Sequence, residues 1–187
     1  MHQSNVSIEK AKLRQRLIAE RSDFQQTDEV VSGLSGQIEA LCLKLKVNTV
    51  AGYLPFGNEP DIEAVLLSFI TKGLNVVMPI SNSDGSLTWV RWHGEHRRPG
   101  IYKFEEAHGE PADPNAIDLI LVPALAVTAQ GMRIGKGKGF YDRALANYQG
   151  RAAAVVFDHE VLDSLPSELH DQKVQFVVTQ NRTISTS

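Results

Sequence analysis

The stretch from Gly131 to Arg143, GMRIGKGKGFYDR, combines the residue types that suit chemistry on an anion. Its four glycines alternate with three cations, which are Arg133, Lys136 and Lys138. Glycine lets backbone N–H groups approach a ligand closely, and successive N–H groups can form an anion-binding concavity. The pattern therefore predicts a loop that binds phosphate. The alternative is a flexible surface turn whose lysines are solvated.

The segments on either side of this loop support the first interpretation. Residues 117–122 (IDLILV) form an apolar run of strand type, and residues 141–148 can continue as a helix. A strand, a glycine loop and a helix in this order are the layout in which a helix N-terminus meets phosphate. The P-loop and dinucleotide-binding patterns do not match, because their glycine spacings are absent. We expect a phosphate loop of another kind.

Residues 133–143 (RIGKGKGFYDR) also resemble the R-x-G-x-G-x-G-[YF]-Y-D-R signature of the 5-formyltetrahydrofolate cyclo-ligases, also called methenyltetrahydrofolate synthetases. The preceding DLILVPALAVTAQG resembles the strand and loop that lead into that signature. The resemblance implies ATP-dependent cyclisation of 5-formyltetrahydrofolate to 5,10-methenyltetrahydrofolate, giving ADP and phosphate through a phosphorylated formyl (iminophosphate) intermediate. Phe140 stands where the family often has Tyr, so a hydrogen bond from that hydroxyl would be missing here.

Lys10 and Arg14 lie four residues apart in a predicted first helix and therefore project from one face. A solvated basic face is the alternative to phosphate binding. In the family that the chain resembles, a K-x-x-[LM]-R pattern in the first helix reaches the nucleotide phosphates, and Lys10 to Arg14 (KAKLR) matches it. The resemblance thus implies that this pair acts in catalysis together with Arg133 and Lys138.

The resemblance assigns the glycine loop to both ligands. The implied ATP-binding residues are Lys10, Arg14, Arg133, Ile134, Gly135, Lys136, Gly137, Lys138, Gly139, Phe140 and Tyr141. The implied folate-binding residues are Leu54, Glu59, Lys136, Gly137, Lys138, Gly139 and Phe140.

Glu59 follows a predicted strand over residues 48–54, in the turn-rich segment PFGNEPD. A carboxylate at the carboxyl end of a strand in an α/β sheet lies where ligands usually bind. The resemblance implies that Glu59 contacts the pterin, with Leu54 as its apolar neighbour. A pterin ring presents adjacent N–H and NH₂ donors, so a carboxylate that accepts from both is a suitable partner.

Two aspartates are implied as ligands of Mg²⁺, a hard cation that prefers carboxylate and phosphate oxygens. Asp142 stands beside the glycine loop, and Asp171 follows His170 just before the last predicted strand. The assignment of Asp171 comes from the resemblance, since the family shows a similar H-D sequence there. The expected cofactors are therefore ATP and Mg²⁺.

The hydrophobic pattern predicts one α/β domain over residues 1–187 with a mainly parallel central sheet. Helices are expected at 7–21, 28–46, 61–72 and 140–148, with a short helix around 163–165. Strands are expected at 48–54, 74–79, 87–92, 118–122, 152–158 and 174–179. The family fold, a three-layer α/β/α sandwich, agrees with this order. Trp89 and Trp92 are expected either to stack on a ligand ring or to pack in the core.

The composition limits the partners of the chain. A net charge of −3 gives no electrostatic reason to expect nucleic acid or an anionic membrane. No segment reaches the roughly 18 apolar residues of a membrane span, and no signal peptide is visible. The single cysteine, Cys42, excludes an internal disulfide and is expected in the core. We expect a cytoplasmic monomer whose substrate is a small molecule, 5-formyltetrahydrofolate with or without a polyglutamate tail.

Two rival interpretations of the function remain. The first is an enzyme of the same fold with another substrate, for instance in thiamine-related metabolism, and the presence of Glu59 argues against it. The second is a non-catalytic nucleotide or anion binder. Asp142 argues against that binder, because a mere anion site gains nothing from an added carboxylate.

Overall fold

A seven-stranded sheet forms the centre of the computed structural model, which describes residues 5–95, 97–102 and 105–186. In spatial order its strands are β12 (Thr183–Ser185), β11 (Phe176–Val178), β9 (Arg151–Val155), β6 (Leu119–Pro123), β1 (Thr49–Ala51), β2 (Asn75–Ser81) and β3 (Leu87–Arg91). The five inner strands pair in parallel, and β12 and β3 close the edges antiparallel. The predicted mainly parallel sheet is confirmed.

The strand order determines where a ligand can enter. The chain passes from β1 to β2 on one side, and then returns to place β6, β9 and β11 on the other side of β1. In open sheets of this kind ligands bind outside the carboxyl ends of the strands, where the order reverses. The reversal lies between β1 and β6, so the connections that follow these two strands meet at one edge.

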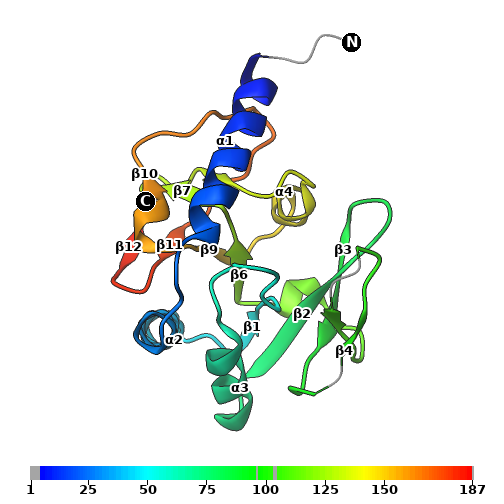
Figure 1. The fold of residues 1–187 in the computed structure, drawn as a ribbon. Helices are drawn as coiled ribbons and strands as arrows, with labels where there is room; N and C mark the ends of the chain where they lie inside the picture. Colours follow the sequence, from blue (N-terminus) through cyan, green and yellow to red (C-terminus); the bar gives the residue numbers. More distant parts are fainter. Residues whose placement is uncertain (1–4, 96, 103–104, 187) are drawn as a thin grey trace.

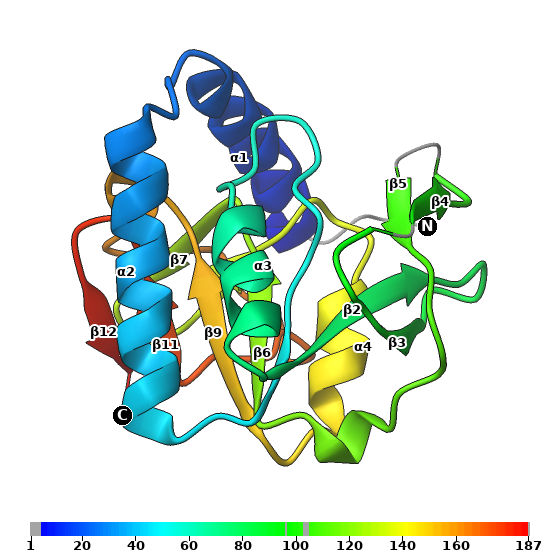
Figure 2. The same ribbon diagram turned by 90° about the horizontal axis from the view of Figure 1, so that it is seen from below.

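Helices cover both faces of the sheet, as Figures 1 and 2 show. Helix α2 (Asp28–Leu45) and helix α3 (Glu63–Thr71) pack on one face, and helix α4 (Phe140–Ala146) packs on the other. Alternate strand residues supply the two cores because successive side chains point to opposite faces. Leu121 joins the α2 side, whereas Ile120 joins the α4 side. This is the expected three-layer α/β/α arrangement.

Helix α1 (Asn5–Ser22) lies outside these layers, beside a small sheet of β10 (Val161–Leu162), β7 (Ala126–Thr128) and β8 (Arg133–Ile134) (Figure 1). Leu17 of α1 packs there with Leu125, Ala126 and Ile134. Helix α1 starts two residues earlier than predicted. Along the described residues, no helix combines the length and apolarity needed to cross a bilayer.

Several local expectations need correction. The helix around residues 163–165 is wrong, since the turn of helix in this region is the 3-10 helix η2 (Asp158–Glu160). Strands β1 and β11 are three residues long, because their apolar runs continue into buried loops. The polar segment before β6 contains an unpredicted hairpin of β4 (Arg97–Pro99) and β5 (Glu105–Ala107), and the 3-10 helix η1 (Pro114–Ala116).

The two tryptophans and the cysteine are core residues. Trp89 and Trp92 are 5% and 1% exposed and belong to the clusters on opposite faces of the sheet, so their packing role is confirmed. Cys42 is buried in α2, as expected.

Candidate active site

A cavity of about 560 Å³ opens at the sheet edge where β1 and β6 end, a volume typical of small-molecule sites. Every residue that the sequence assigned to a ligand lies in its lining. These residues are Lys10, Arg14, Leu54, Glu59, Arg133, Ile134, Gly135, Lys136, Gly137, Lys138, Gly139, Phe140, Tyr141, Asp142 and Asp171. The fold thus brings the first helix, the loop after β1, the glycine loop and the segment before β11 to one place.

The glycine loop is held by the arginine that follows it. The guanidinium of Arg143 donates to the carbonyl of Lys138 at 2.7 Å and to the carbonyl of Gly85, in the β2–β3 turn, at 2.7 Å. Gly139 has φ of 71°, in the left-handed region that glycine adopts without strain. A Cβ at Gly139 would also lie 2.9 Å from Nη1 of Arg143. Glycine and guanidinium therefore determine the loop conformation together.

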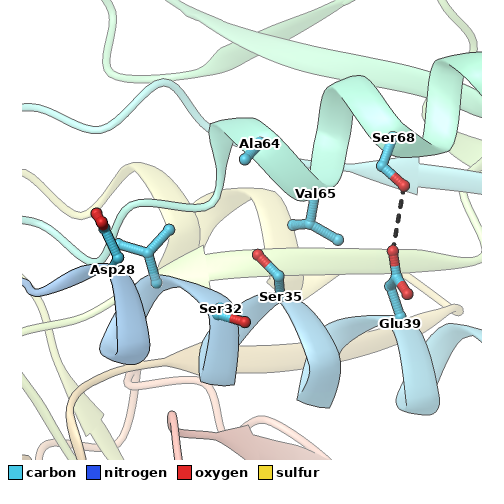
Figure 3. Close-up of a pocket in the computed structure, with 8 residues that line it drawn as sticks. Asp28, Ser32, Ser35, Glu39, Ala64, Val65 and Ser68 are labelled. Carbon is cyan, nitrogen blue, oxygen red and sulfur yellow. Dashed lines mark hydrogen bonds between the residues drawn. The ribbon is translucent and has the colours of Figure 1, made fainter.

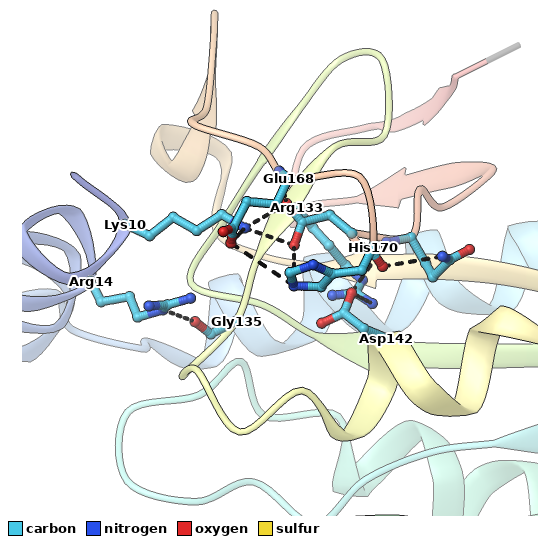
Figure 4. Close-up of polar contacts among 9 residues, drawn as sticks. Lys10, Arg14, Arg133, Gly135, Asp142, Glu168 and His170 are labelled. Atoms are coloured by element: carbon cyan, nitrogen blue, oxygen red, sulfur yellow. Dashed lines mark hydrogen bonds and ion pairs between the residues drawn. The ribbon is translucent and has the colours of Figure 1, made fainter. Parts of the chain in front are cut away.

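Helix α1 directs Lys10 and Arg14 into the cavity, as Figure 4 shows. The Nζ of Lys10 lies 2.6 Å from Oδ2 of Asp171 and 2.9 Å from Oε2 of Glu168. The Nε of Arg14 donates to the carbonyl of Gly135 at 3.0 Å. Burial would lower the pKa of Lys10, but the hydrogen bonds to both carboxylates outweigh it and raise this pKa. Lys10 is therefore a cation at neutral pH.

Arg133 faces the same cavity from β8. Its Nη2 lies 3.0 Å from Oδ1 of Asp142, which also accepts the backbone N–H of Gln172 at 3.2 Å. Arg133 is 6% exposed, and its Nε is buried with no hydrogen-bond partner among the described residues. Native proteins rarely leave a buried donor unpaired. The guanidinium thus retains unused hydrogen-bonding capacity beside the cavity.

Glu59 is 8% exposed, and both of its carboxylate oxygens have partners. Oε1 lies 2.6 Å from Nζ of Lys136, and Oε2 accepts the backbone N–H of Phe56 at 2.9 Å. The Lys136 ammonium also lies 4.9 Å from the centroid of the Phe56 ring. The first lysine of the glycine loop is therefore directed toward the loop after β1.

Comparisons with known proteins match the segments of the chain that contain these residues. A sequence profile of the 5-formyltetrahydrofolate cyclo-ligase family matches residues 6–180, which include α1, the loop after β1, the glycine loop and Asp171. The chain belongs to this family. Residues 133–142 of the signature line the cavity, and Arg143, its last residue, holds the glycine loop from outside the lining.

Two curated cyclo-ligases illustrate the relationship. The chain is 36% identical over 191 residues to the 5-formyltetrahydrofolate cyclo-ligase of Mycolicibacterium smegmatis, covering 94% of this chain and 95% of that protein. It is 27% identical over 144 residues to the 5-formyltetrahydrofolate cyclo-ligase of Escherichia coli, covering 72% of this chain and 79% of that protein.

Solved structures agree with the fold. The NMR structure of Aquifex aeolicus 5,10-methenyltetrahydrofolate synthetase superposes with a TM-score of 0.82 at 25% identity, covering 95% of this chain and 92% of that one. A 5,10-methenyltetrahydrofolate synthetase from Mycoplasma pneumoniae superposes with a TM-score of 0.75 at 20% identity, covering 92% and 99%. The second likeness concerns the fold alone.

Among the cavity residues that the sequence did not indicate, Glu168 and Tyr102 contact the predicted site residues. Glu168, the second carboxylate on Lys10, stands three residues before Asp171, and that spacing was an available signal (Figure 4). Tyr102 lies against Phe140 with ring centroids 5.7 Å apart, and its own centroid is 5.1 Å from Nζ of Lys138. Tyr102 follows an irregular polar segment, so nothing in the local pattern pointed to it.

A second hollow, of about 380 Å³, lies between α2 and α3 (Figure 3). Its described lining contains Asp28, Ser32, Ser35, Glu39 and Ser68 but no lysine or arginine. Glu39 already accepts from Oγ of Ser68 at 3.1 Å. This hollow has none of the cations or glycines of the first cavity, and we assign it no function.

Proposed function

We propose that this protein catalyses the ATP-dependent cyclisation of 5-formyltetrahydrofolate to 5,10-methenyltetrahydrofolate, with ADP and phosphate as products. One observation carries the proposal, namely the convergence of a glycine loop, several cations and the buried Glu59 carboxylate in one cavity. The loop suits a nucleotide phosphate, and the carboxylate suits the donors of a pterin. Membership of the cyclo-ligase family supports the choice of reaction.

In this proposal Lys10, Arg14 and Arg133 bind the nucleotide phosphates. Arg14 and Arg133 offer planar forks that match phosphate geometry, and Lys10 adds a compact charge. Lys138 and the backbone N–H groups of residues 135–139 surround the group that is transferred. Backbone donors fixed by the Arg143 contacts need no reorganisation during the reaction, which is the main advantage of a preorganised site.

The chemistry consists of two displacements. The formyl oxygen attacks the γ-phosphorus of ATP, the bond from that phosphorus to the bridging oxygen breaks, and ADP leaves. N10 of the folate then attacks the formyl carbon, the bond from that carbon to the phosphorylated oxygen breaks, and phosphate leaves while N10 loses its proton. The protein contributes no nucleophile, because positioning and charge neutralisation dominate phosphoryl transfer.

A protein base is not required in this scheme. Tyr141 lies in the cavity, but burial, reinforced by Glu59, raises its pKa well above the ordinary value of a phenol. Tyr141 is therefore a neutral phenol at physiological pH, and with Phe140 and Leu54 it forms the wall of the folate site. Glu59 accepts the pterin N–H and NH₂ groups.

We further propose that Asp142 and Asp171 hold Mg²⁺ together with the nucleotide phosphates. Carboxylate oxygens are the ligands that Mg²⁺ prefers, and Mg²⁺ is usually bound by one or two of them plus phosphate. Asp142 accepts from Arg133 and Asp171 from Lys10, so a metal ion must compete with these cations. We infer that the ion enters with the nucleotide, whose phosphates bind the cations that it displaces.

The remaining proposals concern the oligomeric state, the compartment and the polyglutamate tail of the substrate. We infer that the chain acts as a single-domain monomer in the cytoplasm and that it accepts folates with a polyglutamate tail. The lone cysteine is free and buried, which fits a reducing compartment, and the net charge of −3 gives no electrostatic reason to expect nucleic acid or an anionic membrane as partner.

The test is a direct assay of purified protein with 5-formyltetrahydrofolate, ATP and Mg²⁺. We expect the near-ultraviolet absorbance of the methenyl product to grow only when all three are present. Absence of product while ATP still binds would indicate another substrate for the same fold. Absence of both product and ATP binding would contradict the assignment of the glycine loop as a phosphate site.

A further inference from the structure

Helix α1 carries two of the proposed phosphate-binding residues but has few buried contacts. The structure describes all of α1, and the residues buried in it are Lys10, Leu17 and Arg21. The spacings of seven and four residues place these side chains in one stripe along the helix. Two of the three are charged, so the position of α1 depends on what those two cations contact as well as on the packing of Leu17.

Arg21 forms a buried ion pair with Glu160, and neither residue belongs to the cavity lining. Its Nε lies 2.6 Å from Oε1 of Glu160, and its Nη2 lies 2.6 Å from Oε2. The same Nη2 donates to the carbonyl of Ala124 at 2.6 Å, and Glu160 accepts the backbone N–H of Phe157 at 2.9 Å. Arg21 and Glu160 are only 4% and 2% exposed. These contacts attach α1 to the segment after β6 and to η2.

Stability alone is a poor explanation for this pair. Desolvation of two charges usually cancels their attraction, and apolar residues of similar volume often stabilise a core equally well. Arg21 also leaves its Nη1 buried without a hydrogen-bond partner among the described residues, which is a further cost. The two parallel hydrogen bonds do provide directionality, because a bidentate pair accepts one relative geometry. They therefore determine both the axial position and the rotation of α1.

The ion pair between Lys10 and Asp171, at the other end of the stripe, cannot hold α1 in position throughout the reaction. Lys10 contacts Asp171 inside the cavity, and in the proposed function both bind other partners when the nucleotide enters. Arg21 is eleven residues further along α1, or roughly 16 Å at 1.5 Å per residue. Since Arg21 and Glu160 contact no ligand, their pair can persist with and without nucleotide.

We propose that Arg21 and Glu160 are positioning residues that hold α1 in the register from which Lys10 and Arg14 reach the nucleotide phosphates. This inference rests on the proposed function, because it requires that α1 binds ATP. The inference concerns the binding of ATP by Lys10 and Arg14 and not the binding of the folate. Glu59 and Leu54 belong to the loop after β1, where Lys136 and the backbone N–H of Phe56 hold the Glu59 carboxylate and Gln26, which follows α1, donates to the Glu59 carbonyl.

The experiment compares calorimetric titrations of two ligands, ATP with Mg²⁺ and 5-formyltetrahydrofolate alone. The test protein carries Arg21→Met with Glu160→Gln, which removes both charges and keeps an acceptor for Phe157. The matched control carries Arg16→Met with Glu20→Gln, because that pair lies on the same helix but is exposed, with 61% and 56% exposure and a separation of 3.5 Å. Thermal melts establish that each variant is folded.

We expect the test variant to raise the Kd for ATP about tenfold, equivalent to about 1.4 kcal/mol. Its Kd for 5-formyltetrahydrofolate should stay within about twofold of wild type, and the control should leave both constants within that range. Arg21→Lys keeps the buried charge without the fork, and we expect it to raise the ATP Kd about threefold. It serves as the milder variant if the double substitution does not fold.

Parallel titration of Lys10→Ala separates the failure of this inference from the failure of the proposed function. If Lys10→Ala weakens ATP binding while the folded Arg21 variants do not, or if those variants weaken both ligands alike, the positioning role is wrong. If Lys10→Ala has no effect either, α1 is not part of the nucleotide site. A wild-type protein that does not bind ATP would overturn both proposals.

Discussion

The Nζ of Lys136 lies 2.6 Å from Oε1 of Glu59, so the glycine loop and the loop after β1 meet through one ion pair inside the cavity. The resemblance assigns Lys136 to both proposed ligands, whereas it assigns Glu59 to the pterin alone. A pterin that donates to Glu59 competes with Lys136 for the same carboxylate. The folate and the nucleotide are therefore expected to influence each other's binding.

The first prediction is cooperative binding of the two substrates. Saturating 5-formyltetrahydrofolate should lower the Kd of a non-hydrolysable ATP analogue about threefold to tenfold, within the usual range of coupling between sites. Lys136→Met should abolish this coupling, because no cation is then released from Glu59. Calorimetric titration with and without the folate measures it. Equal Kd values in wild type would show that the ion pair persists when the folate binds.

The second prediction concerns α1. Lys10→Ala and Arg14→Ala should each raise the KM for ATP at least tenfold, because a hydrogen bond to a charged group contributes about 1.5–3 kcal/mol. The KM for the folate should change little. Lys12→Ala is the matched control, since Lys12 is exposed on the same helix and does not line the cavity. Unchanged ATP kinetics in the first two variants, with folding intact, would contradict their assignment.

The third prediction compares two glycines. Gly139→Ala places a side chain at φ of 71°, and should destabilise the loop by about 1–2 kcal/mol and lower kcat/KM about tenfold. Gly36→Ala should leave activity unchanged and stabilise the protein by about 0.5–1 kcal/mol, because Gly36 is inside α2 and, among the described residues, no atom beyond its chain neighbours and the backbone of its own helix lies within 4 Å of an added Cβ. Urea unfolding and steady-state kinetics of both variants provide the measurement. A Gly139→Ala enzyme of normal activity would show that the left-handed turn is dispensable.

The fourth prediction is an alkaline loss of stability through Cys42. Burial, with a smaller effect from Glu39, raises the pKa of this thiol to about 12. An unfolded thiol has a pKa of about 8.5, so above that pH the unfolded state loses a proton that the folded state keeps. Stability from this group is complete below about pH 8.5 and is lost as the pH rises toward 12.

Cys42→Ala provides the measurement for this effect. Between about pH 8.5 and 10, the free energy of unfolding of wild type should fall by up to about 1.4 kcal/mol per pH unit more than that of the variant. Urea unfolding at several pH values gives both curves, and a thiol reagent at pH 8 should react slowly with the folded protein. Parallel curves for the two proteins would show that the thiol ionises equally in both states.

Much of the fold follows from local patterns that the sequence displays. Helix α2 begins at Asp28 with Thr27 as its cap, and the apolar runs predicted as strands at 118–122 and 152–158 form β6 and β9, although β9 ends at Val155, before η2. Small elements escaped prediction because two or three residues carry no measurable periodicity. Strand β8 (Arg133–Ile134) exists because it pairs with β7, and that partner is visible only in three dimensions.

The candidate site likewise contains residues that the sequence indicates and contacts that it does not. Residue type and spacing alone indicated Arg133, Lys136 and Lys138 as candidates for phosphate binding, with a solvated turn as the alternative, and their individual roles came from the family resemblance. The contacts between residues that are distant in sequence could not be predicted. Arg21 and Glu160 are separated by 139 positions, and nothing in either local sequence distinguishes a buried charge from a solvated one. Charged residues are almost never buried unless paired, so a sequence reading places both on the surface by default.

The order of the strands has a consequence for how such an enzyme can change. Glu59 and the glycine loop reach the cavity from the connections after β1 and β6, which are neighbours in space but are separated in the chain by α3, β2, β3 and a hairpin. The ion pair, hydrogen bond and ring contact that join the two connections all use the side chain of Lys136, so changes in residues 52–60 leave the backbone of residues 135–139 in place as long as Lys136 keeps a partner. In the proposed function, natural variation can therefore change the wall that binds the pterin while the glycine loop that binds phosphate is retained.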